Sequence, residues 1–233
     1  MVPSSNTTNE AEWWRMVPPG VSVHVARMLQ GLQTNEDKIS KMADHAEQAA
    51  EELATANVNV IAFGCTTGSL LKGKGHDRQL SDKITAVSGI PAITTSTAVL
   101  KALQALRIKK VAVVTPYIDE LNRKEAEFLE ANGFHVAEIK GLGLKTNIEI
   151  GNQESSIAYR MARSVSKECD GYFISCTNFR TIEVIEVLEQ ELQKPVISSN
   201  QATLAASLKI AGVSLSSVSG YGSLFRTELL LEN

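Results

Sequence analysis

The sequence predicts an α/β fold that is built twice, as two doubly wound lobes with parallel sheets and a shared cleft. Two apolar segments of similar sequence, 58–66 and 170–177, both end in the dipeptide Cys-Thr. Apolar runs of this length between polar residues are typical of strands that are buried on both faces. Strand-like and helix-like stretches alternate through both halves of the chain, which is the pattern of parallel sheets with right-handed crossovers.

The first half contains five predicted elements before its last helix. They are a helix that starts near Asn9, a strand within 20–27, a helix over 35–56, the strand that leads to Cys65, and a strand within 89–95. Apolar residues at helical spacing predict the amphipathic helix over 35–56. An Ala/Leu-rich helix follows the last of these strands.

The second half repeats this plan. It opens with a full strand at 109–115 and a helix over 118–132, after which Gly133 suits the C′ position. The remaining predicted elements are a strand within 133–138, helices over 150–167 and 181–192, and a strand within 193–199.

The matching order of elements predicts two domains of similar size. The first lobe, with Cys65, comprises residues 1–96 and 206–233, because we expect the segment from 210 onward to return to it. The second lobe, with Cys176, comprises residues 97–205.

Composition excludes several classes of function. The chain of 233 residues has a formal charge of -3 and 21% charged residues, so it has no basic surface for nucleic acid and no polybasic membrane patch. No stretch has the length of a membrane span or the features of a signal peptide, and we expect a cytoplasmic protein with a small ligand. Three cysteines, at 65, 169 and 176, match neither a disulfide framework nor a zinc pattern.

The two Cys-Thr turns are the candidate reactive groups. Cys65 and Cys176 lie 111 positions apart, and each is predicted at the carboxyl end of a parallel strand, where open α/β sheets bind ligands. Backbone N–H groups and a helix dipole at such a turn favour the thiolate. Thr66 and Thr67 supply hydroxyls after the first thiol, and Thr177 with Asn178 follows the second. The alternative is that both are buried structural cysteines, which is the role we expect for Cys169.

One further pattern is misleading. The segment Gly68-Ser-Leu-Leu-Lys-Gly-Lys74 fits the spacing of a phosphate-binding loop and follows a predicted strand. Gly75, however, stands where Ser or Thr would bind magnesium, and Gly75-His-Asp does not indicate a helix start. A loop over the cleft is the preferred interpretation of this segment.

Taken together, these motifs resemble those of the aspartate/glutamate racemase superfamily. The resemblance covers nearly the whole chain and is strongest to its branch of maleate cis-trans isomerases and arylmalonate decarboxylases. It is carried by the following segments: Pro3-Ser-Ser-Asn6-Thr-Thr, Cys65-Thr-Thr-Gly-Ser, Thr115-Pro-Tyr117, Cys176-Thr-Asn and Pro195-Val-Ile-Ser-Ser-Asn-Gln-Ala202. The family fold implies two lobes related by a pseudo-twofold axis, with the active site in the cleft between them.

The resemblance also implies a reaction. In the isomerase branch, the Cys65 thiolate would add to the double bond of a small dicarboxylate, with Cys176 as acid/base partner, and maleate would become fumarate. Asn6, Tyr117 and Asn147 match family positions that bind the carboxylates. No metal or organic cofactor is implied, and a homodimer is expected by analogy. Structural roles are the alternatives for these residues: a helix cap for Asn6, core packing for Tyr117 and a turn for Asn147.

Three other functions stay open from the sequence. An amino-acid racemase of the aspartate/glutamate type would use both thiols as bases, on opposite faces of one stereocentre. An arylmalonate-type decarboxylase keeps only the second cysteine, so Cys65 argues against it. A two-lobed ligand-binding protein without catalytic activity would not need the thiols.

Overall fold

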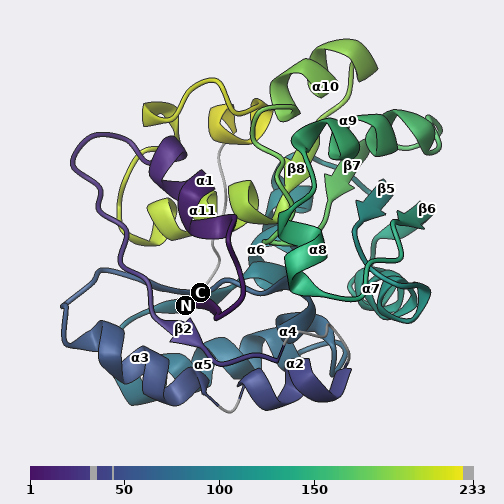
Figure 1. Ribbon diagram of the computed structural model, residues 1–233. Coiled ribbons are helices and arrows are strands. Elements are labelled where there is room, and N and C mark those ends of the chain that lie inside the picture. The colour runs from purple at the N-terminus through teal and green to yellow at the C-terminus, as the bar shows by residue number, and fades with distance from the viewer. Residues whose placement is uncertain (32–35, 44, 228–233) are drawn as a thin grey trace.

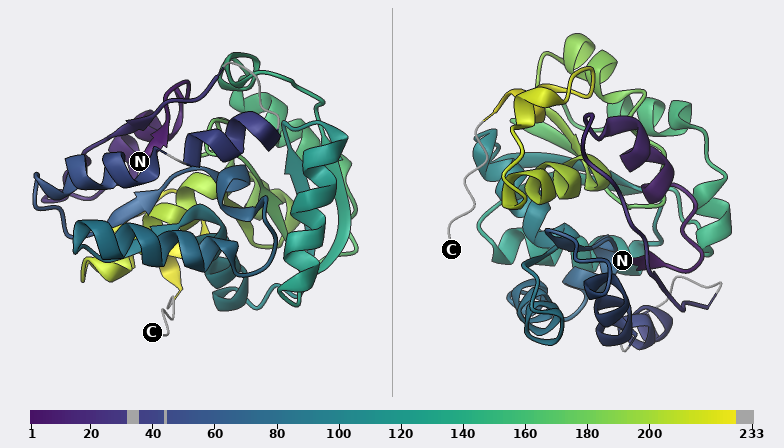
Figure 2. Two further views of the ribbon diagram at one scale, coloured as in Figure 1. Left: turned by 90° about the horizontal axis from the view of Figure 1, so that it is seen from below. Right: turned by 90° about the vertical axis from the view of Figure 1, so that its left-hand side faces the viewer.

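The described residues form eight parallel strands, four in each half of the chain. The computed structural model describes residues 1–31, 36–43 and 45–227. The strands are β1 (Val2–Pro3), β2 (Arg27–Met28), β3 (Ile61–Phe63) and β4 (Ala92–Thr94), then β5 (Lys110–Thr115), β6 (His135–Gly141), β7 (Gly171–Ile174) and β8 (Val196–Ser198). Figures 1 and 2 show them surrounded by helices.

The helices are as follows: α1 (Asn9–Met16), α2 (Glu36–Ala43), α3 (Ala46–Ala54), α4 (Thr66–Leu70), α5 (His76–Ser88), α6 (Thr95–Ala105), α7 (Asp119–Ala131), α8 (Asn147–Gly151), α9 (Ser155–Ser164), α10 (Ile185–Leu192) and α11 (Ser199–Ile210). Two short 3-10 segments, Leu215–Ser217 and Ser223–Arg226, follow α11.

Strand order confirms that the fold is built twice. The second half forms one parallel sheet in the order β6-β5-β7-β8. In the first half β1 pairs with β2 and β3 pairs with β4, both in parallel. Backbone hydrogen bonds join these two pairs, because the Met1 nitrogen donates to the Ala62 carbonyl at 2.8 Å and the Gly64 N–H donates to the Met1 carbonyl at 2.8 Å. The first half therefore runs β2-β1-β3-β4, which is the order of the second.

Two equivalent helices, α6 and α11, join the halves in a common core. Each follows the last strand of its half and begins with a capping hydroxyl. The Thr94 hydroxyl accepts from the Thr97 N–H, and the Ser198 hydroxyl accepts from the Gln201 N–H. Ten of the twelve residues of α11 are buried, and eight of these ten are small or apolar, as expected for a helix that is buried on all sides. The two helices lie at the centre of Figure 1, and one hydrophobic cluster contains residues from both sheets and both helices.

Three predicted helices differ from the structure. The helix over 35–56 consists of α2 and α3, with a break next to His45, and residues 32–35 and 44 lie outside the described residues. The helix over 150–167 is interrupted, because Glu154 has extended backbone between α8 and α9. The helix predicted from Thr181 begins only at Ile185, since a side chain of α1 accepts the Thr181 N–H.

The segment after Gly68 also differs from its prediction. Gly68 and Leu70 lie within α4, and α5 begins at His76 directly after Gly75, where no helix start was expected. The phosphate-loop spacing therefore spans a helix and a turn, and it does not form one loop between a strand and a helix.

The C-terminal segment contacts elements of both halves. The Tyr221 hydroxyl donates to the Arg15 carbonyl at 2.9 Å, and the Ser223 N–H donates to Glu189 of α10 at 2.7 Å. Residues 228–233 lie outside the described residues, and the proposed domain boundaries stay a prediction.

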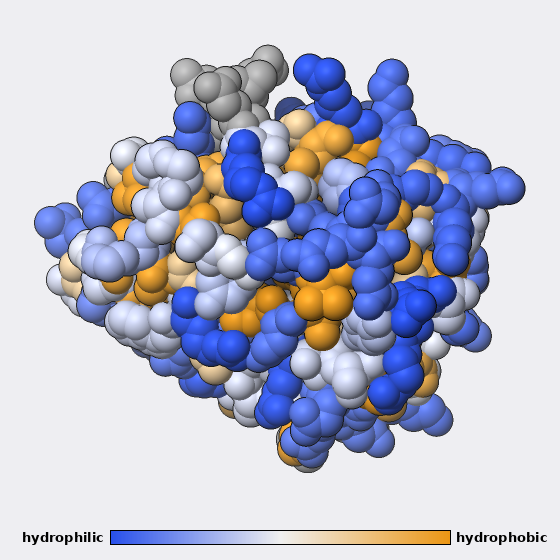
Figure 3. Space-filling model, turned by 90° about the horizontal axis from the view of Figure 1, so that it is seen from above, coloured by the Kyte–Doolittle hydropathy of each residue, from blue (hydrophilic) through white to orange (hydrophobic). Residues whose placement is uncertain are grey.

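The surface is polar, with scattered apolar residues. On the face shown in Figure 3, hydrophobic residues lie among hydrophilic ones. Within the described part of the chain, none of the helices is long and apolar enough to cross a membrane.

The shared core predicts a large effect of truncation in α6. Leu103 is fully buried in the cluster that joins the halves, so Leu103→Ala should lower the free energy of unfolding by about 2–5 kcal/mol. Val187→Ala on α10, where the side chain is 45% exposed, is the matched control and should change it by about 0.5 kcal/mol or less. Urea unfolding measures both, and equal losses would contradict a common core at α6.

Candidate active site

One cavity brings all nine sequence-predicted site residues together, at the carboxyl ends of strands from both halves. Its empty volume is about 310 Å³. The lining residues are Pro3, Asn6, Gln30, Cys65, Thr66, Thr67, Tyr117, Asn147, Cys176, Thr177 and Asn178. None of these side chains is a permanently charged group, so the cavity offers thiols, hydroxyls and amides.

Cys65 lies two residues after β3 and is the N-cap of α4. Its sulfur is 3.8 Å from the Thr67 hydroxyl and also faces the Gly68 N–H. A Cβ on Gly68 would lie 3.2 Å from this sulfur and 3.1 Å from the Phe63 ring. Both contacts are tight, so glycine lets the sulfur lie close to the backbone of α4 without displacing its neighbours. Burial raises the pKa of the Cys65 thiol, and the Gly68 and Thr67 donors offset this only in part.

Cys176 lies two residues after β7, at the position equivalent to Cys65, but in a turn of unusual backbone. Its φ is +95°, which side chains other than glycine rarely adopt and which costs about 1–3 kcal/mol. The Cys176 N–H donates to Ser199 Oγ at 3.0 Å, and the Asn178 N–H donates to the Cys176 sulfur at 3.4 Å. These bonds hold the strained turn.

Burial dominates the ionisation of the second thiol. It raises the pKa of Cys176 to about 12, although hydrogen bonds from the Tyr117 hydroxyl and the Asn178 N–H act in the opposite direction. The pKa of Tyr117 is also raised well above its usual value, first by burial and then by the charge of Cys176. The prediction that the turns favour thiolates is therefore wrong. The helix dipole that was expected to stabilise them is weak here, because the helix after Cys65 has only five residues and α10 begins nine residues after Cys176.

Asn6 and Thr177 connect the two halves at the cavity wall. The Asn6 amide donates to Thr177 Oγ1 at 3.1 Å, and that hydroxyl donates to the Gly64 carbonyl at 3.0 Å. Asn6 Oδ1 also accepts from the N–H groups of Thr8 and Asn9, at the start of α1. Asn6 thus lines the cavity and accepts backbone donors at the start of α1, whereas carboxylate binding by Asn6 stays a prediction.

A second set of amides forms another part of the cavity wall. The Asn178 amide donates to the Asn147 carbonyl at 2.7 Å, and Asn178 Oδ1 accepts from the Thr7 N–H at 2.8 Å. The Asn147 amide donates to Ser5 Oγ at 2.8 Å and lies 3.4 Å from the Gln30 oxygen. This amide wall is therefore assembled from four segments of the chain that are separate in sequence.

Glu12 of α1 is buried and accepts hydrogen bonds from the segment that follows the second cysteine turn. Its carboxylate accepts from the N–H groups of Thr181 and Ile182, at 2.6 and 3.2 Å, and from the Asn200 amide at 2.6 Å. The Asn200 amide also donates to the Thr177 carbonyl at 3.1 Å. Burial raises the pKa of Glu12 to about 7 despite these donors.

Sequence reasoning missed two lining residues and this supporting carboxylate. Gln30 lies two residues after β2, so its place after a strand could have indicated that it lines the site. Pro3 is the last residue of β1 and lines the cavity only because that strand ends there. Glu12 gave no signal, because one acidic residue in an amphipathic helix is usually solvent-exposed.

The arrangement suits proton transfer or covalent chemistry on a small anion. Two thiols from equivalent strand ends open on one cavity, and neutral hydrogen-bond donors surround them. Among the described residues there is no group of three or more His, Cys, Asp or Glu side chains that could hold a metal ion.

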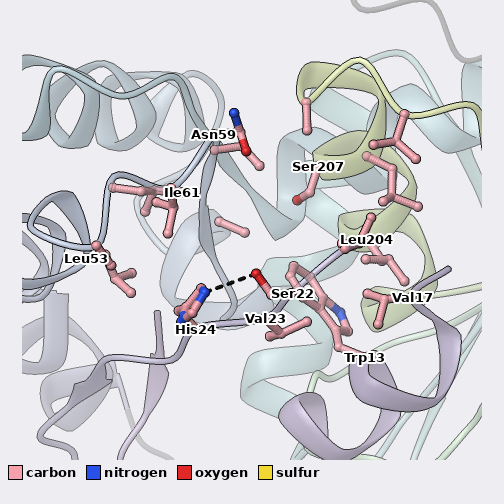
Figure 4. A pocket seen from close by; sticks show the side chains of 18 of the residues that line it. Trp13, Val17, Ser22, Val23, His24, Leu53, Asn59, Ile61, Leu204 and Ser207 are labelled. Carbon is pink, nitrogen blue, oxygen red and sulfur yellow. Dashed lines mark hydrogen bonds between the residues drawn. The ribbon is translucent and has the colours of Figure 1, made fainter. Parts of the chain in front are cut away.

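A second, larger cavity lies elsewhere and shares no lining residue with the first. It has about 1050 Å³ of empty volume and lies between α1, α11 and β3 (Figure 4). Trp13, Val17 and Leu204 form an apolar wall, and His24 is the one titratable side chain that lines it. His24 bonds to the Ser22 hydroxyl at 3.1 Å. Ser22 and His24 are exposed neighbours on one loop, and no acidic residue lines this cavity to orient the imidazole, so the smaller cavity with its two thiols is the better candidate.

Known proteins match this chain along almost its entire length. The family model for arylmalonate decarboxylase matches residues 14–225. A maleate isomerase of Nocardia farcinica is 30% identical over 98% of this chain and 94% of its own length.

Solved structures agree with the sequence matches. A Nocardia farcinica maleate cis-trans isomerase mutant with a covalently bound succinylcysteine intermediate is 28% identical, with a TM-score of 0.92 over 97% of this chain and 96% of the other. A maleate isomerase mutant from Pseudomonas putida S16 with maleate is 25% identical, also with a TM-score of 0.92, over 96% and 95% of the two chains.

The packing of the amide wall gives a testable constraint on Gly151. A Cβ there would lie 2.5 Å from the Thr7 hydroxyl and 3.1 Å from the Asn178 amide. Gly151→Ala should therefore push the wall apart and lower the unfolding free energy by about 1–3 kcal/mol. Gly31→Ala is the control, since its nearest neighbour would be a flexible Lys38 carbon at 3.4 Å. Similar denaturation midpoints for Gly151→Ala and the unsubstituted protein would contradict the tight wall.

Proposed function

This chain belongs to the family of arylmalonate decarboxylases and maleate isomerases, and from that premise we propose that it is a cofactor-independent maleate cis-trans isomerase. The observation that carries the proposal is the pair of thiols, Cys65 and Cys176, that line one uncharged cavity. A decarboxylase of this family is expected to need only the second cysteine, whereas addition to a double bond needs a nucleophile as well as a proton donor.

Cys65 is the proposed nucleophile. Because burial raises its pKa, the Cys65 thiol first gives up its proton to solvent. The thiolate then adds to one carbon of the maleate double bond, so that a C–S bond forms and the π electron pair moves to the other carbon. The Cys176 thiol gives its proton to that carbon, which leaves a succinyl thioether on Cys65. Rotation about the new C–C single bond exchanges cis for trans. The Cys176 thiolate then removes a proton, the C–S bond breaks, and fumarate leaves with the Cys65 thiolate regenerated.

Neutral donors would hold the two carboxylates during this rotation. The N–H groups of Thr66 and Thr67 lie in the first turn of α4, where a helix has no acceptors of its own for them. The hydroxyl of Tyr117 and the amides of Asn6 and Asn147 line the same cavity, with Thr177 and Asn178. Preorganised neutral donors stabilise the charge that develops on the second carbon and do not fix a proton of their own.

Racemisation is the second candidate, because the thiols occupy equivalent positions in the two halves. Cys65 and Cys176 each lie two residues after a strand, at the ends of β3 and β7. Two bases on opposite faces of a stereocentre would have this symmetry. Assays with aspartate and glutamate enantiomers distinguish racemisation from maleate isomerisation.

Assembly and location are further proposals. We expect a homodimer in the cytoplasm, by analogy with enzymes of this kind. Size-exclusion chromatography with light scattering measures the mass of the assembly and thus tests the homodimer.

The decisive experiment detects the covalent intermediate. Cys176→Ser keeps the nucleophile and removes the thiolate that takes a proton in the second step, so a maleate-derived adduct that solvent has protonated should accumulate on the peptide that contains Cys65. Cys65→Ser should form no adduct and lose maleate turnover by about 10³-fold or more. Mass spectrometry of the digested protein locates the adduct.

Cys169→Ser is the matched control. Cys169 is buried, lies outside the cavity and donates to the Ser166 carbonyl at 3.5 Å, so its substitution should leave turnover nearly unchanged. Turnover retained in Cys65→Ser, or aspartate or glutamate racemisation without an adduct, would overturn the proposed reaction.

A further inference from the structure

A buried carboxyl lies beside the second cysteine turn and takes no part in the proposed chemistry. Glu125, in the middle of α7, is 1% exposed. Its Oε1 accepts a hydrogen bond from the Ser175 hydroxyl at 2.6 Å, and Ser175 directly precedes Cys176. Its Oε2 has no hydrogen-bond partner, which is true of no other buried side-chain oxygen or nitrogen in the described part of the chain.

The surroundings of Glu125 contain nothing to neutralise a charge. It lines a small space of about 180 Å³ between α7, α4, α6 and β7. The other lining residues carry no titratable group: Thr66, Leu70, Ser96, Val99, Phe128, Leu129 and Phe173. Thr66 also lines the active-site cavity, so the two spaces share this lining residue. A negative charge on Glu125 raises the pKa of Cys176 and the pKa of Tyr117.

Glu12 and Glu125 differ in their hydrogen bonds, although burial raises the pKa of both carboxyls to about 7. Glu12 is equally buried, but both of its oxygens accept from amide or backbone donors. Glu125 has one neutral hydroxyl donor, and an ionised carboxylate with so little solvation is costly in a protein interior. Burial raises the pKa of Glu125 to about 7, and the Ser175 bond lowers it only in part.

We propose that Glu125 is a positioning residue that works as a neutral carboxylic acid. It holds Ser175, and thereby the strained turn at Cys176, without placing a negative charge beside the cavity. The second part of this inference rests on the proposed function, because that cavity would bind two carboxylates and a thiolate with neutral donors alone. A charged Glu125 would repel all three.

The first test needs no substrate and so does not depend on the proposed reaction. Infrared spectroscopy should show a carboxylic acid band in the unsubstituted protein near pH 6 that disappears as the pH rises through about 7. Because burial also raises the pKa of Glu12 to about 7, each variant is compared with the unsubstituted protein by difference spectroscopy. The difference spectrum of Glu125→Gln at pH 6 should contain a carboxylic acid band, and that of Glu127→Gln, on an exposed position of the same helix, should contain none. A Glu125→Gln difference spectrum without an acid band would overturn the proposal.

Ser175→Ala provides a second variant that leaves the carboxyl in place. It removes the one bond that favours the ionised form, so the midpoint of the acid band should shift upward in pH. An unchanged or lower midpoint would contradict the assignment of Ser175 as the partner.

A thiolate titration tests the effect on Cys176. In the Cys65→Ser, Cys169→Ser background, the pH dependence of alkylation by iodoacetamide reports this thiol alone. Glu125 is ionised at the alkaline pH where Cys176 titrates, and its charge raises the pKa of Cys176, so Glu125→Gln should lower that pKa. Glu127→Gln should leave it unchanged, and an equal pKa in all three proteins would overturn the electrostatic link.

Kinetics then test the part that rests on maleate. The ratio of KM in the unsubstituted protein to KM in Glu125→Gln should rise roughly tenfold as the pH increases from about 6 to about 8.5. A constant ratio, with the acid band and the thiol shift present, would refute the repulsion of substrate but not the neutral acid. Absence of maleate turnover in every protein would instead refute the proposed function and leave the substrate-free results as they stand.

Discussion

The hydroxyl of Ser199 fixes the two cysteine turns relative to each other. It accepts from Thr66 Oγ1 at 2.9 Å and from the Cys176 N–H at 3.0 Å, so one oxygen bonds to both turns. Ser199 is the first residue of α11, whose buried surface joins the sheets of both halves. The spacing of the thiols therefore depends on the same helix that carries the core, and a rigid core produces a rigid site.

Charge is the second constraint on this site. The cavity presents neutral donors, burial raises the pKa of both thiols, and burial raises the pKa of Glu125 to about 7. Such a cavity favours protonated thiols, and a protonated thiol reacts with oxidants more slowly than a thiolate does.

The sequence predicted much of this architecture because the chain repeats itself. Cys65 and Cys176 were found from two similar strand ends, and strand order confirms the repeat. Helix boundaries were less accurate where a tertiary contact takes a backbone group, as Glu12 does at Thr181. Gln30, Glu12 and Glu125 were missed, because their roles arise from packing between segments that no local pattern connects. The ionisation of the thiols was mispredicted for the same reason, since burial outweighs the short helix after Cys65.

The positive φ of Cys176 has a consequence for how this protein can change. Glycine at that position would relieve the backbone strain, because it adopts such a conformation without steric conflict. Cys176→Gly would, however, also remove a buried side chain and the hydrogen bond that its sulfur accepts from the Asn178 N–H. In this one residue, backbone strain stands against packing and chemistry.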